Sequence, residues 1–404
     1  MTLPNLDAEI DRANTQSVKW GLRVEHGFPP RFELTERFFG PNRDLPLWVA
    51  DMDFQCPPAI LTALRQRVDH GIFGYTIRDD AFHDAVIHWM RTRQSWQVRR
   101  EWIVGTPGVV PALHMLVRTF VQPGQKVLVQ TPVYHPFFSA IAKNGAVQVN
   151  SPLREINGGY EMDFDDLAAK LADPDLTLAI LCHPHNPVGR VWTRTELTRF
   201  AELCRNHNVL VVADEIHGDL IMPGVEFTPY GALPEEFVQR AIICTAPSKT
   251  FNLAGLHTSN IIIPDAELRG RFMQTLDSLG LFGANTFGVV ATTAGYTGGA
   301  DWLDAVIAYI AENYATLTRR LAAELPGVRV FPLQGTYLAW LDFRAFGQPS
   351  SELEARLLDH GGVYLEDGSI FGPEGDGFLR MNLACPRGLL NEAITRIVQE
   401  FSGR

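Results

Sequence analysis

Short runs of apolar residues recur between residues 100 and 265, with little of the polar alternation of a half-exposed strand. The runs are Lys126–Gln130, Leu176–Cys182, Val209–Ala213, Ala241–Cys244 and Asn260–Ile263. Such runs are typical of strands covered on both faces of a sheet. A helical pattern separates two of them: it opens with a capping box at Thr193 and Glu196, and its apolar positions lie on one face. This alternation predicts an α/β fold with a mostly parallel sheet.

The C-terminal part of the chain follows a different pattern. One long helix is predicted over residues 302–325, because Pro326 and Gly327 follow it. Strand patterns at Thr336–Phe343 and Gly377–Ala384 flank a helix around Ser351–His360. We therefore expect a large α/β domain at residues 46–287, and a smaller α+β domain in which residues 288–404 join the N-terminal residues 1–45. A ligand site between the two is the default expectation for such an arrangement.

Composition argues against several classes of function. The chain has 404 residues, of which 46% are hydrophobic and 20% charged, as in ordinary globular proteins. Its net charge of −11 argues against a nucleic-acid partner, which needs a basic face. No apolar run approaches the roughly 20 residues that cross a membrane, and the N-terminus lacks a signal-peptide pattern. We expect a cytoplasmic protein whose five scattered cysteines are reduced and mostly buried.

Polar residues follow several of the predicted strands. Tyr134, Asn186, Asp214 and Lys249 each lie just beyond the carboxyl end of an apolar run. Ligands of open α/β sheets bind at this edge, so these side chains are candidates for one site. Gly108, in "TPGVVPAL", precedes a helical pattern and could present free backbone N–H groups to a phosphate.

Each candidate also has a purely structural interpretation. Asp214 could cap the next helix, Asn186 could shape a turn, and Arg380 could form a surface ion pair. Gly108 by itself is a weak phosphate signal, because the chain has neither a P-loop nor a dinucleotide fingerprint. Lys249 is harder to dismiss, since its neighbours in "APSKTFNLAG" are mostly small or apolar. An amine with a lowered pKa is the usual nucleophile for a Schiff base.

Together the candidates match the needs of one cofactor, pyridoxal phosphate. This cofactor requires a lysine for the imine and a carboxylate at the pyridine nitrogen. It also needs a partner that stacks on its ring, a donor to its phenolate oxygen and a cradle for its phosphate. An α-amino-acid substrate adds an arginine that binds the substrate carboxylate.

Longer motifs point the same way. "PHNPVGR", "ADEIH", "SKTFNLAGLH" and "FLRMNLACPR", in this order, resemble fold-type-I pyridoxal-phosphate enzymes of the class I and II aminotransferase superfamily. Within it, "LPLWVADMDF", "GIFGYT", "PGVVPAL", "TPVYHPFF" and "SKTFNLAGLHTSNIIIP" are similar to cystathionine β-lyases (C–S lyases) of the PatB/MalY type. The resemblance covers about residues 15–400. It implies the fold-type-I transferase fold and a homodimer with its active sites at the subunit interface.

The resemblance also implies roles around the cofactor ring. Lys249 would form the Schiff base, and Asp214 would pair with the pyridine nitrogen. Asn186 would donate to the phenolate oxygen, and Tyr134 would stack on the ring. Lys249 would then remove the α-proton and protonate the leaving sulfur, with help from Tyr134 or Tyr75.

Further roles concern the phosphate and the substrate. Gly108, Val109 and Ser248 would hold the phosphate. Tyr75 would reach the phosphate of the partner subunit's site, and Arg380 would bind the substrate α-carboxylate.

Two positions depart from the common aminotransferase pattern. His217 stands where many aminotransferases have a tyrosine that donates to the phenolate oxygen, and we expect it to contact the cofactor. His257 stands where many have a phosphate-binding arginine, and could equally be a packing histidine. His183 and His185 raise the alternative of a zinc site. No pattern of further ligands completes such a site, and we expect no metal.

The resemblance implies β-elimination from L-cystathionine or a related L-cysteine S-conjugate, giving a thiol, pyruvate and ammonia. An aminotransferase acting on an L-amino acid is the alternative within the superfamily. A regulatory protein that binds partners through the same scaffold is the alternative of a different class. The group on sulfur would lie in a distal pocket, for which Asp51–Phe54 and the N-terminal segment are the candidates.

Overall fold

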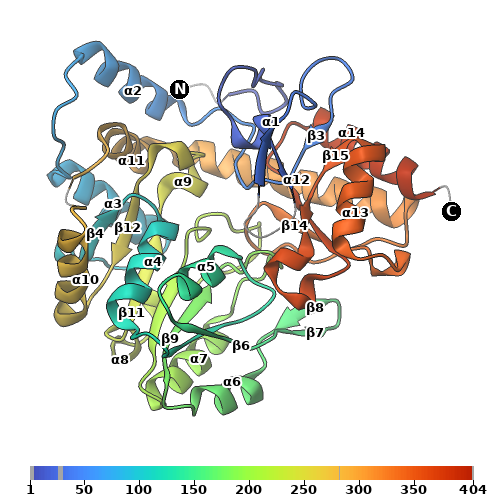
Figure 1. Cartoon of the computed structure of the whole chain (residues 1–404). Coiled ribbons are helices and arrows are strands. Elements are labelled where there is room, and N and C mark those ends of the chain that lie inside the picture. The colour runs from blue at the N-terminus through green and yellow to red at the C-terminus, as the bar shows by residue number, and fades with distance from the viewer. Residues whose placement is uncertain (1–3, 26–30, 282, 403–404) are drawn as a thin grey trace.

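The computed structural model describes residues 4–25, 31–281 and 283–402. Its largest sheet has seven strands in the order β4-β12-β11-β10-β9-β5-β6 (Figure 1). The strands are β4 Ile103–Thr106, β5 Lys126–Val129, β6 Val147–Asn150, β9 Leu176–Cys182, β10 Leu210–Asp214, β11 Ala241–Thr245 and β12 Ser259–Ile262. Neighbouring strands are parallel except at β12, which is antiparallel to both β11 and β4. The predicted mostly parallel sheet is confirmed.

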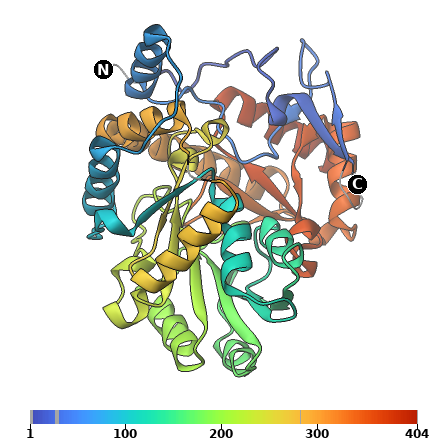
Figure 2. The ribbon, with the colours of Figure 1, turned by 60° about the vertical axis from the view of Figure 1, so that its left-hand side comes forward.

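Both faces of this sheet are buried, which explains the apolar runs. In β10, Val212 packs into one core, whereas Val211 and Ala213 pack into the core on the opposite face. The first face is covered by α4 Val109–Phe120, α5 Pro136–Ala142 and α10 Ala266–Ser278. There α4 and α10 lie side by side (Figure 2). The second face is covered by α6 Phe164–Leu171, α7 Arg194–Asn206 and α8 Glu235–Val238.

The capping box predicted at the start of α7 is present. Thr193 accepts a hydrogen bond from the backbone N–H of Glu196, and the Glu196 carboxylate accepts one from the N–H of Thr193. Cys204 is buried on the inner face of the same helix, and every cysteine is a free thiol. Cys56 is only half-buried, and the other four are buried.

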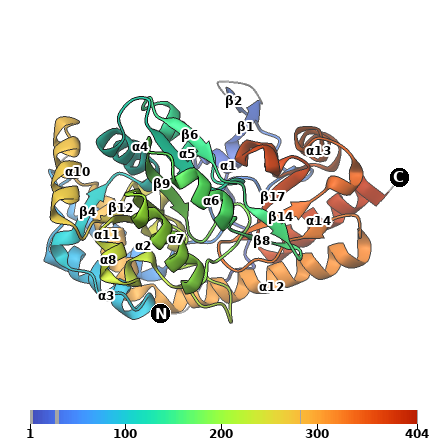
Figure 3. The ribbon, with the colours of Figure 1, turned by 90° about the horizontal axis from the view of Figure 1, so that it is seen from below.

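A second sheet has the order β13-β14-β17-β16 and is antiparallel. Its strands are β13 Arg329–Val330, β14 Leu338–Asp342, β16 Glu366–Asp367 and β17 Phe378–Asn382. Its helices are α12 Ala300–Glu324, α13 Ser350–Arg356 and α14 Arg387–Ser402. Figure 3 shows α12 running the length of this part, in contact with α11 at one end and α14 further on.

The C-terminal predictions hold with one difference. The long helix, both strands and the start of the shorter helix lie where expected, but α13 ends at Arg356. Residues Leu357–Gly361 then form a π-helical turn, closed by Gly362 in a left-handed conformation with φ of 64°.

The remaining elements connect these parts. They are α1 Val18–Gly21, α2 Pro58–His70, α3 Asp80–Arg93, α9 Pro247–Thr250 and α11 Thr286–Gly298, the hairpins β1 Leu22–Glu25 with β2 Arg31–Leu34 and β7 Arg154–Ile156 with β8 Gly159–Glu161, and the parallel pair β3 Leu45–Pro46 with β15 Val363–Tyr364. Within the described residues, no helix combines the length and the apolar character needed to cross a membrane.

Candidate active site

Four predicted site residues come together at the carboxyl edge of the large sheet. Asp214 ends β10, Asn186 follows β9, Tyr134 follows β5, and Lys249 lies in α9 just after β11. All four line one inner pocket, whose other residues are Ala50, Val109, Val110, Cys182, Ile216 and His217. The pocket is narrow, about 40 Å³.

Lys249, which is half-buried, places its amine in this pocket. Its Nζ donates a hydrogen bond of 2.6 Å to the carbonyl oxygen of Ala50. Burial lowers the pKa of Lys249 to about 8, while the carboxylates of Asp51 and Asp214 act in the opposite direction. A neutral amine is therefore accessible close to neutral pH, as a nucleophile or a base requires.

Asp214 contributes a buried carboxyl group to the same pocket as Lys249. Burial raises its pKa to about 7, although the N–H of Ile216 donates to its Oδ1 at 3.1 Å. The residues after Asp214 form a turn, so the interpretation of Asp214 as a helix cap is wrong. A carboxylate in such dry surroundings favours a positively charged partner.

Arg380 is buried in the wall of the site, so its interpretation as a surface residue is wrong. It lies on β17 and is 3% exposed. It donates to the Asn186 Oδ1 at 3.1 Å, to the Trp48 carbonyl at 3.0 Å and to the Glu366 carboxylate at 2.8 Å. Its Nε is buried and has no hydrogen-bond partner among the described residues. That unsatisfied donor suits one oxygen of a carboxylate ligand.

Asn186 therefore does more than shape a turn. It precedes a cis proline peptide, and its side-chain oxygen accepts a hydrogen bond from Arg380. The hydrogen bond brings a residue predicted for the cofactor next to the residue predicted for the substrate.

Tyr134 and His217 complete the polar lining. Burial raises the pKa of the Tyr134 hydroxyl to about 12, so the group stays protonated. Burial also holds the pKa of His217 well below its usual value, so its imidazole is neutral. The Nδ1 of His217 is buried and has no hydrogen-bond partner among the described residues, and its ring packs edge-on against Tyr337. His217 thus has a ring nitrogen free for a ligand.

The residues predicted for a phosphate lie beside the pocket. Gly108 is the N-cap of α4 and makes no side-chain cap, so the first N–H groups of the helix remain available. Val109 lines the pocket directly. Ser248 is half-buried next to Lys249, but neither it nor Gly108 is among the lining residues.

A wider outer cavity of about 560 Å³ shares Ala50, Tyr134 and Lys249 with the inner pocket. Trp48 and Tyr364 stack in its wall with their ring centroids 4.9 Å apart. Its other residues are Val24, Val49, His135, Ser351, Glu354, Glu366, Asp367, Ser369, Ile370 and Arg380.

The prediction of Asp51–Phe54 as the distal wall is wrong. The neighbouring residues Trp48, Val49 and Ala50 line the outer cavity, whereas Met52 and Phe54 pack in the core and Asp53 binds Lys19. The N-terminal segment contributes Val24 to this wall, as expected.

Several predicted residues lie outside the pocket. Tyr75 is fully exposed, on the segment between α2 and α3. His257 is exposed, so its interpretation as a packing histidine is wrong. His183 and His185 are buried and hydrogen-bond through Nε2 to the carbonyls of Thr228 and Pro132. No group of three potential metal ligands occurs within the described residues.

Sequence reasoning missed two residues that hold the Lys249 amine, besides Glu366, which accepts from Arg380. The carbonyl of Ala50 accepts from Lys249, and the Tyr337 hydroxyl donates to the same oxygen at 2.7 Å. A backbone carbonyl has no signature in sequence. Tyr337, in "GTYLAW", stands inside an apolar strand pattern, where a tyrosine is ordinary.

Comparison with known proteins agrees with this site. Residues 44–397 match the family described as aminotransferase class I and II. The chain belongs to this family. Cystathionine β-lyase PatB of Bacillus subtilis (strain 168) is 47% identical over 398 residues, which cover 98% of this chain and 100% of that protein.

Solved structures of the family have the same fold. Cystalysin from Treponema denticola, which contains pyridoxal 5′-phosphate, has a TM-score of 0.92 and 33% identity, covering 99% of both chains. The pyridoxal-phosphate-bound C–S lyase from Staphylococcus hominis has a TM-score of 0.88 and 32% identity, covering 99% of this chain and 98% of that one. The resemblance to the superfamily and to lyases of the PatB type is confirmed, as is the fold that it implied.

Proposed function

We propose that this family member is a pyridoxal-phosphate-dependent C–S lyase. It cleaves L-cystathionine or a related L-cysteine S-conjugate to a thiol, pyruvate and ammonia. The observation that carries the proposal is the Lys249 amine, which shares the inner pocket with Asp214 and Asn186 and the adjoining outer cavity with Arg380, the hydrogen-bond partner of Asn186. The similarity to PatB along nearly the whole chain supports the choice of elimination over transamination.

The donor set fits pyridoxal phosphate. Lys249 would form the Schiff base, and Asp214 would pair with the pyridine nitrogen, which its dry surroundings favour. Asn186 and His217 would donate to the phenolate oxygen, and Tyr134 would cover the ring. The orphaned Nδ1 of buried His217 supports this fit, because a buried polar atom in a native protein usually has a partner.

The N-terminal end of α4 is the proposed phosphate cradle. Gly108 and Val109 would offer backbone N–H groups, and Ser248 would add its hydroxyl from α9. Gly108 has φ of 155°, where a side chain is poorly tolerated, so a substitution here would disturb the entry to the helix. When bound, the cofactor supplies an electron sink for the substrate α-carbon.

The protein's own groups have three tasks in this proposal. Arg380 binds the substrate carboxylate, with its Nε as the donor that is still unsatisfied. Lys249, released by the substrate amine, takes the α-proton and delivers a proton to the departing sulfur. Tyr134 stays protonated at neutral pH, so it can assist that delivery.

The proposed assembly is a homodimer in which Tyr75 of each subunit reaches the other subunit's phosphate. Support comes from the segment after α2, where Ile72, Phe73, Tyr75 and Ile77 are all exposed. Such a run of exposed apolar residues is typical of an interface. The proposed location is the cytoplasm, which the free thiols of the chain support.

The test is incubation of purified protein with L-cystathionine. Release of pyruvate and free thiol without an added oxo-acid is the expected result. A requirement for an oxo-acid acceptor, with no thiol released, contradicts the lyase and favours an aminotransferase. Lys249→Ala removes both the visible absorbance of the covalently bound cofactor and the turnover. A cellular phenotype that persists in this variant would point to a regulatory role.

A further inference from the structure

Side chains donate hydrogen bonds to the successive backbone carbonyls of residues 48–52. Asn382 Nδ2 donates to the Val49 carbonyl at 2.7 Å and to the Asp51 carbonyl at 2.6 Å. The Ala50 carbonyl between them accepts from Lys249 and from Tyr337. One amide therefore holds carbonyls two residues apart.

These contacts hold the Ala50 carbonyl in place. Val49 and Ala50 lie in a bend of the chain, and the Asn382 amide fixes the carbonyls before and after that of Ala50. The Ala50 carbonyl itself faces Lys249 and Tyr337, since both donate to it.

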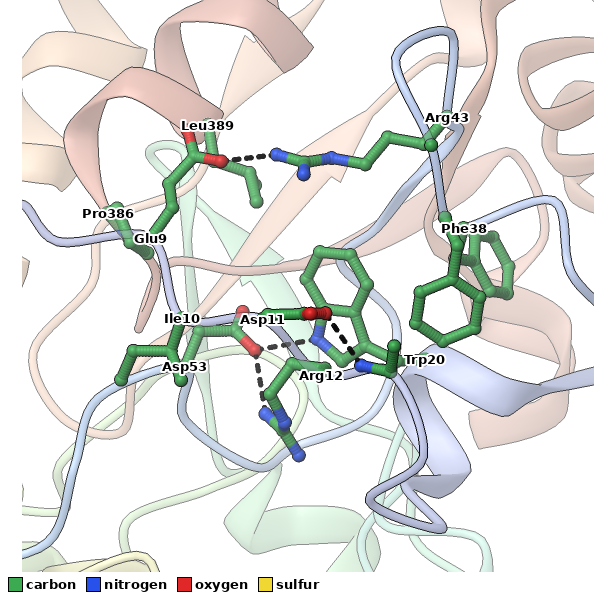
Figure 4. Close-up of a pocket in the computed structure, with 13 residues that line it drawn as sticks. Glu9, Ile10, Asp11, Arg12, Trp20, Phe38, Arg43, Asp53, Pro386 and Leu389 are labelled. Atoms are coloured by element: carbon green, nitrogen blue, oxygen red, sulfur yellow. Dashed lines mark hydrogen bonds and ion pairs between the residues drawn. The ribbon is translucent and has the colours of Figure 1, made fainter.

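Both ends of the segment are anchored as well. Asp53 accepts hydrogen bonds from Trp20 Nε1 at 2.8 Å and from Arg12 at 3.1 Å (Figure 4). The buried Lys19 amine adds a bond of 2.6 Å to the same carboxylate and reaches the Asp51 carbonyl at 3.3 Å. At the other end, Arg380 holds the Trp48 carbonyl.

We propose that the Ala50 carbonyl orients the Lys249 amine while it acts as the base, and that Asn382 and Tyr337 are positioning residues: Asn382 aims this carbonyl, and Tyr337 occupies one of its two acceptor positions. The proposal rests on the proposed function, because it assigns Lys249 the proton transfer. It gives roles to two residues that line neither the inner pocket nor the outer cavity.

The chemistry of the three groups supports this. A carbonyl oxygen has two lone pairs, and the Tyr337 hydroxyl takes one of them. One acceptor position is then left for Lys249. A neutral amine that donates one N–H to this position keeps its lone pair directed elsewhere, free to accept a proton. Without the fixed acceptor the amine rotates about its last bond, and fewer of its orientations are productive.

The charge of Lys249 depends on groups from several elements. Burial lowers its pKa most, Asp51 and Asp214 raise it, and Arg380 lowers it. His217 is neutral and so adds no charge. The Ala50 carbonyl stabilises the ammonium form more than the amine. A change in how it is aimed therefore changes the pH at which Lys249 becomes reactive.

In the cofactor-free protein, substitutions of the two positioning residues should shift the midpoint pH of Lys249 acetylation in opposite directions. Asn382→Ala lets the carbonyl turn away, so the ammonium loses an acceptor and this midpoint falls by about half a pH unit or more. Tyr337→Phe removes the competing donor, so the carbonyl accepts more strongly from the ammonium and the midpoint rises by about the same amount. The measurement is the pH dependence of Lys249 acetylation by acetic anhydride, followed by peptide mass spectrometry.

The chain offers a matched control for each variant. Asn313 is equally buried and its Nδ2 also donates to two carbonyls two residues apart, those of Leu383 and Cys385, at 3.0 Å each. The Tyr314 hydroxyl donates to the Phe331 carbonyl at 3.1 Å. Asn313→Ala and Tyr314→Phe thus remove the same kinds of bond away from Lys249, and should leave the midpoint unchanged.

The holoenzyme gives a second readout. At neutral pH both positioning variants should lower kcat about tenfold or more and change KM less than about twofold, because alignment is lost in the proton transfer. With substrate deuterated at the α-carbon, the isotope effect should rise in both. Unchanged midpoints, or shifts of one sign shared with the controls, overturn the proposal. Because acetylation uses no substrate, its result stands even if wild-type protein fails to release thiol, which would overturn only the proposed reaction.

Tyr337→Phe also serves if Asn382→Ala does not fold. It removes a single hydroxyl from a buried ring, and its upward midpoint shift is tested independently of Asn382.

Discussion

The guanidinium of Arg380 and the side-chain oxygen of Asn186 are 3.1 Å apart and hydrogen-bonded, although 194 residues separate them in the chain. Arg380 comes from the central strand pair of the small sheet, and Asn186 from the edge of the large sheet. A substrate carboxylate held by Arg380 would therefore lie next to Asn186, the residue proposed to contact the cofactor's phenolate oxygen.

Arg380→Lys tests the carboxylate site. A lysine is a single point donor and cannot replace the guanidinium at Asn186, Trp48 and the substrate together. We expect kcat/KM for cystathionine to fall about 100-fold, mostly through KM. Arg320→Lys, in the partly exposed ion pair with Glu324, is the control and should leave kcat/KM unchanged. A loss confined to kcat, with KM unaltered, would show that Arg380 does not bind the ground-state carboxylate.

Asp214→Asn tests the electrostatics of the cofactor-free pocket. The folded-state pKa of Asp214 is about 7, above the value of an unfolded aspartate, so the native protein binds more protons than the unfolded chain between the two values. The contribution of Asp214 to stability therefore falls as the pH rises through that window. Asparagine removes this penalty and can still accept the bond from Ile216.

The expected result is an apoprotein whose free energy of unfolding in urea exceeds that of the wild type at pH 8 by about 2 kcal/mol or more. Near pH 3 the difference should nearly vanish, since Asp214 is then mostly protonated in both states. Asp84→Asn, on the exposed side of α3, is the control and should show no such pH dependence. Equal stabilisation at both pH values would mean that burial of Asp214 is not the cause.

Lys19→Met tests the anchor of the N-terminal segment. The Lys19 amine is fully buried and binds Asp53 at 2.6 Å, so its loss leaves a buried carboxylate with fewer partners. We expect the free energy of unfolding to fall by about 3 kcal/mol. Lys126→Met, in a half-exposed pair with Asp173, is the control and should cost much less. The double variant Lys19→Met/Asp53→Asn should lose less unfolding free energy than the two single variants lose together. If the two losses simply add, Lys19 and Asp53 do not stabilise each other.

Most of the fold could be predicted because its signals are local. The strands of the large sheet read as apolar runs since both faces are covered, and Asp214 and Lys249 were found because polar residues at strand ends converge at one edge. The antiparallel direction of β12 has no such signal: it is buried along its whole length, as the parallel strands β10 and β11 are. The division into residues 46–287 and the rest stays a prediction.

The contacts that hold the Lys249 amine could not be predicted from the sequence, for a physical reason. The contacts of Ala50 with Lys249 and Tyr337 join residues 199 and 287 positions apart and depend on a backbone carbonyl. Long-range contacts of this kind follow from the assembled fold and not from any local pattern. Glu366, which binds Arg380, was missed likewise, since a lone glutamate beside a turn looks like a surface residue.

Mixed dimers test the proposed contribution of Tyr75 from the partner subunit. Lys249→Ala and Tyr75→Ala should each have lost most or all activity as homodimers. Subunit exchange between them pairs one intact Lys249 with one intact Tyr75, so half the dimers gain one complete site of two. Mixing equal amounts should then restore about a quarter of wild-type activity, as two-fold symmetry requires. If the mixture regains no activity despite demonstrated subunit exchange, Tyr75 does not act across the interface.

Ile77→Glu tests the proposed interface itself. It should shift the protein toward a monomer in size-exclusion chromatography, because a charge cannot be buried unpaired in an apolar contact.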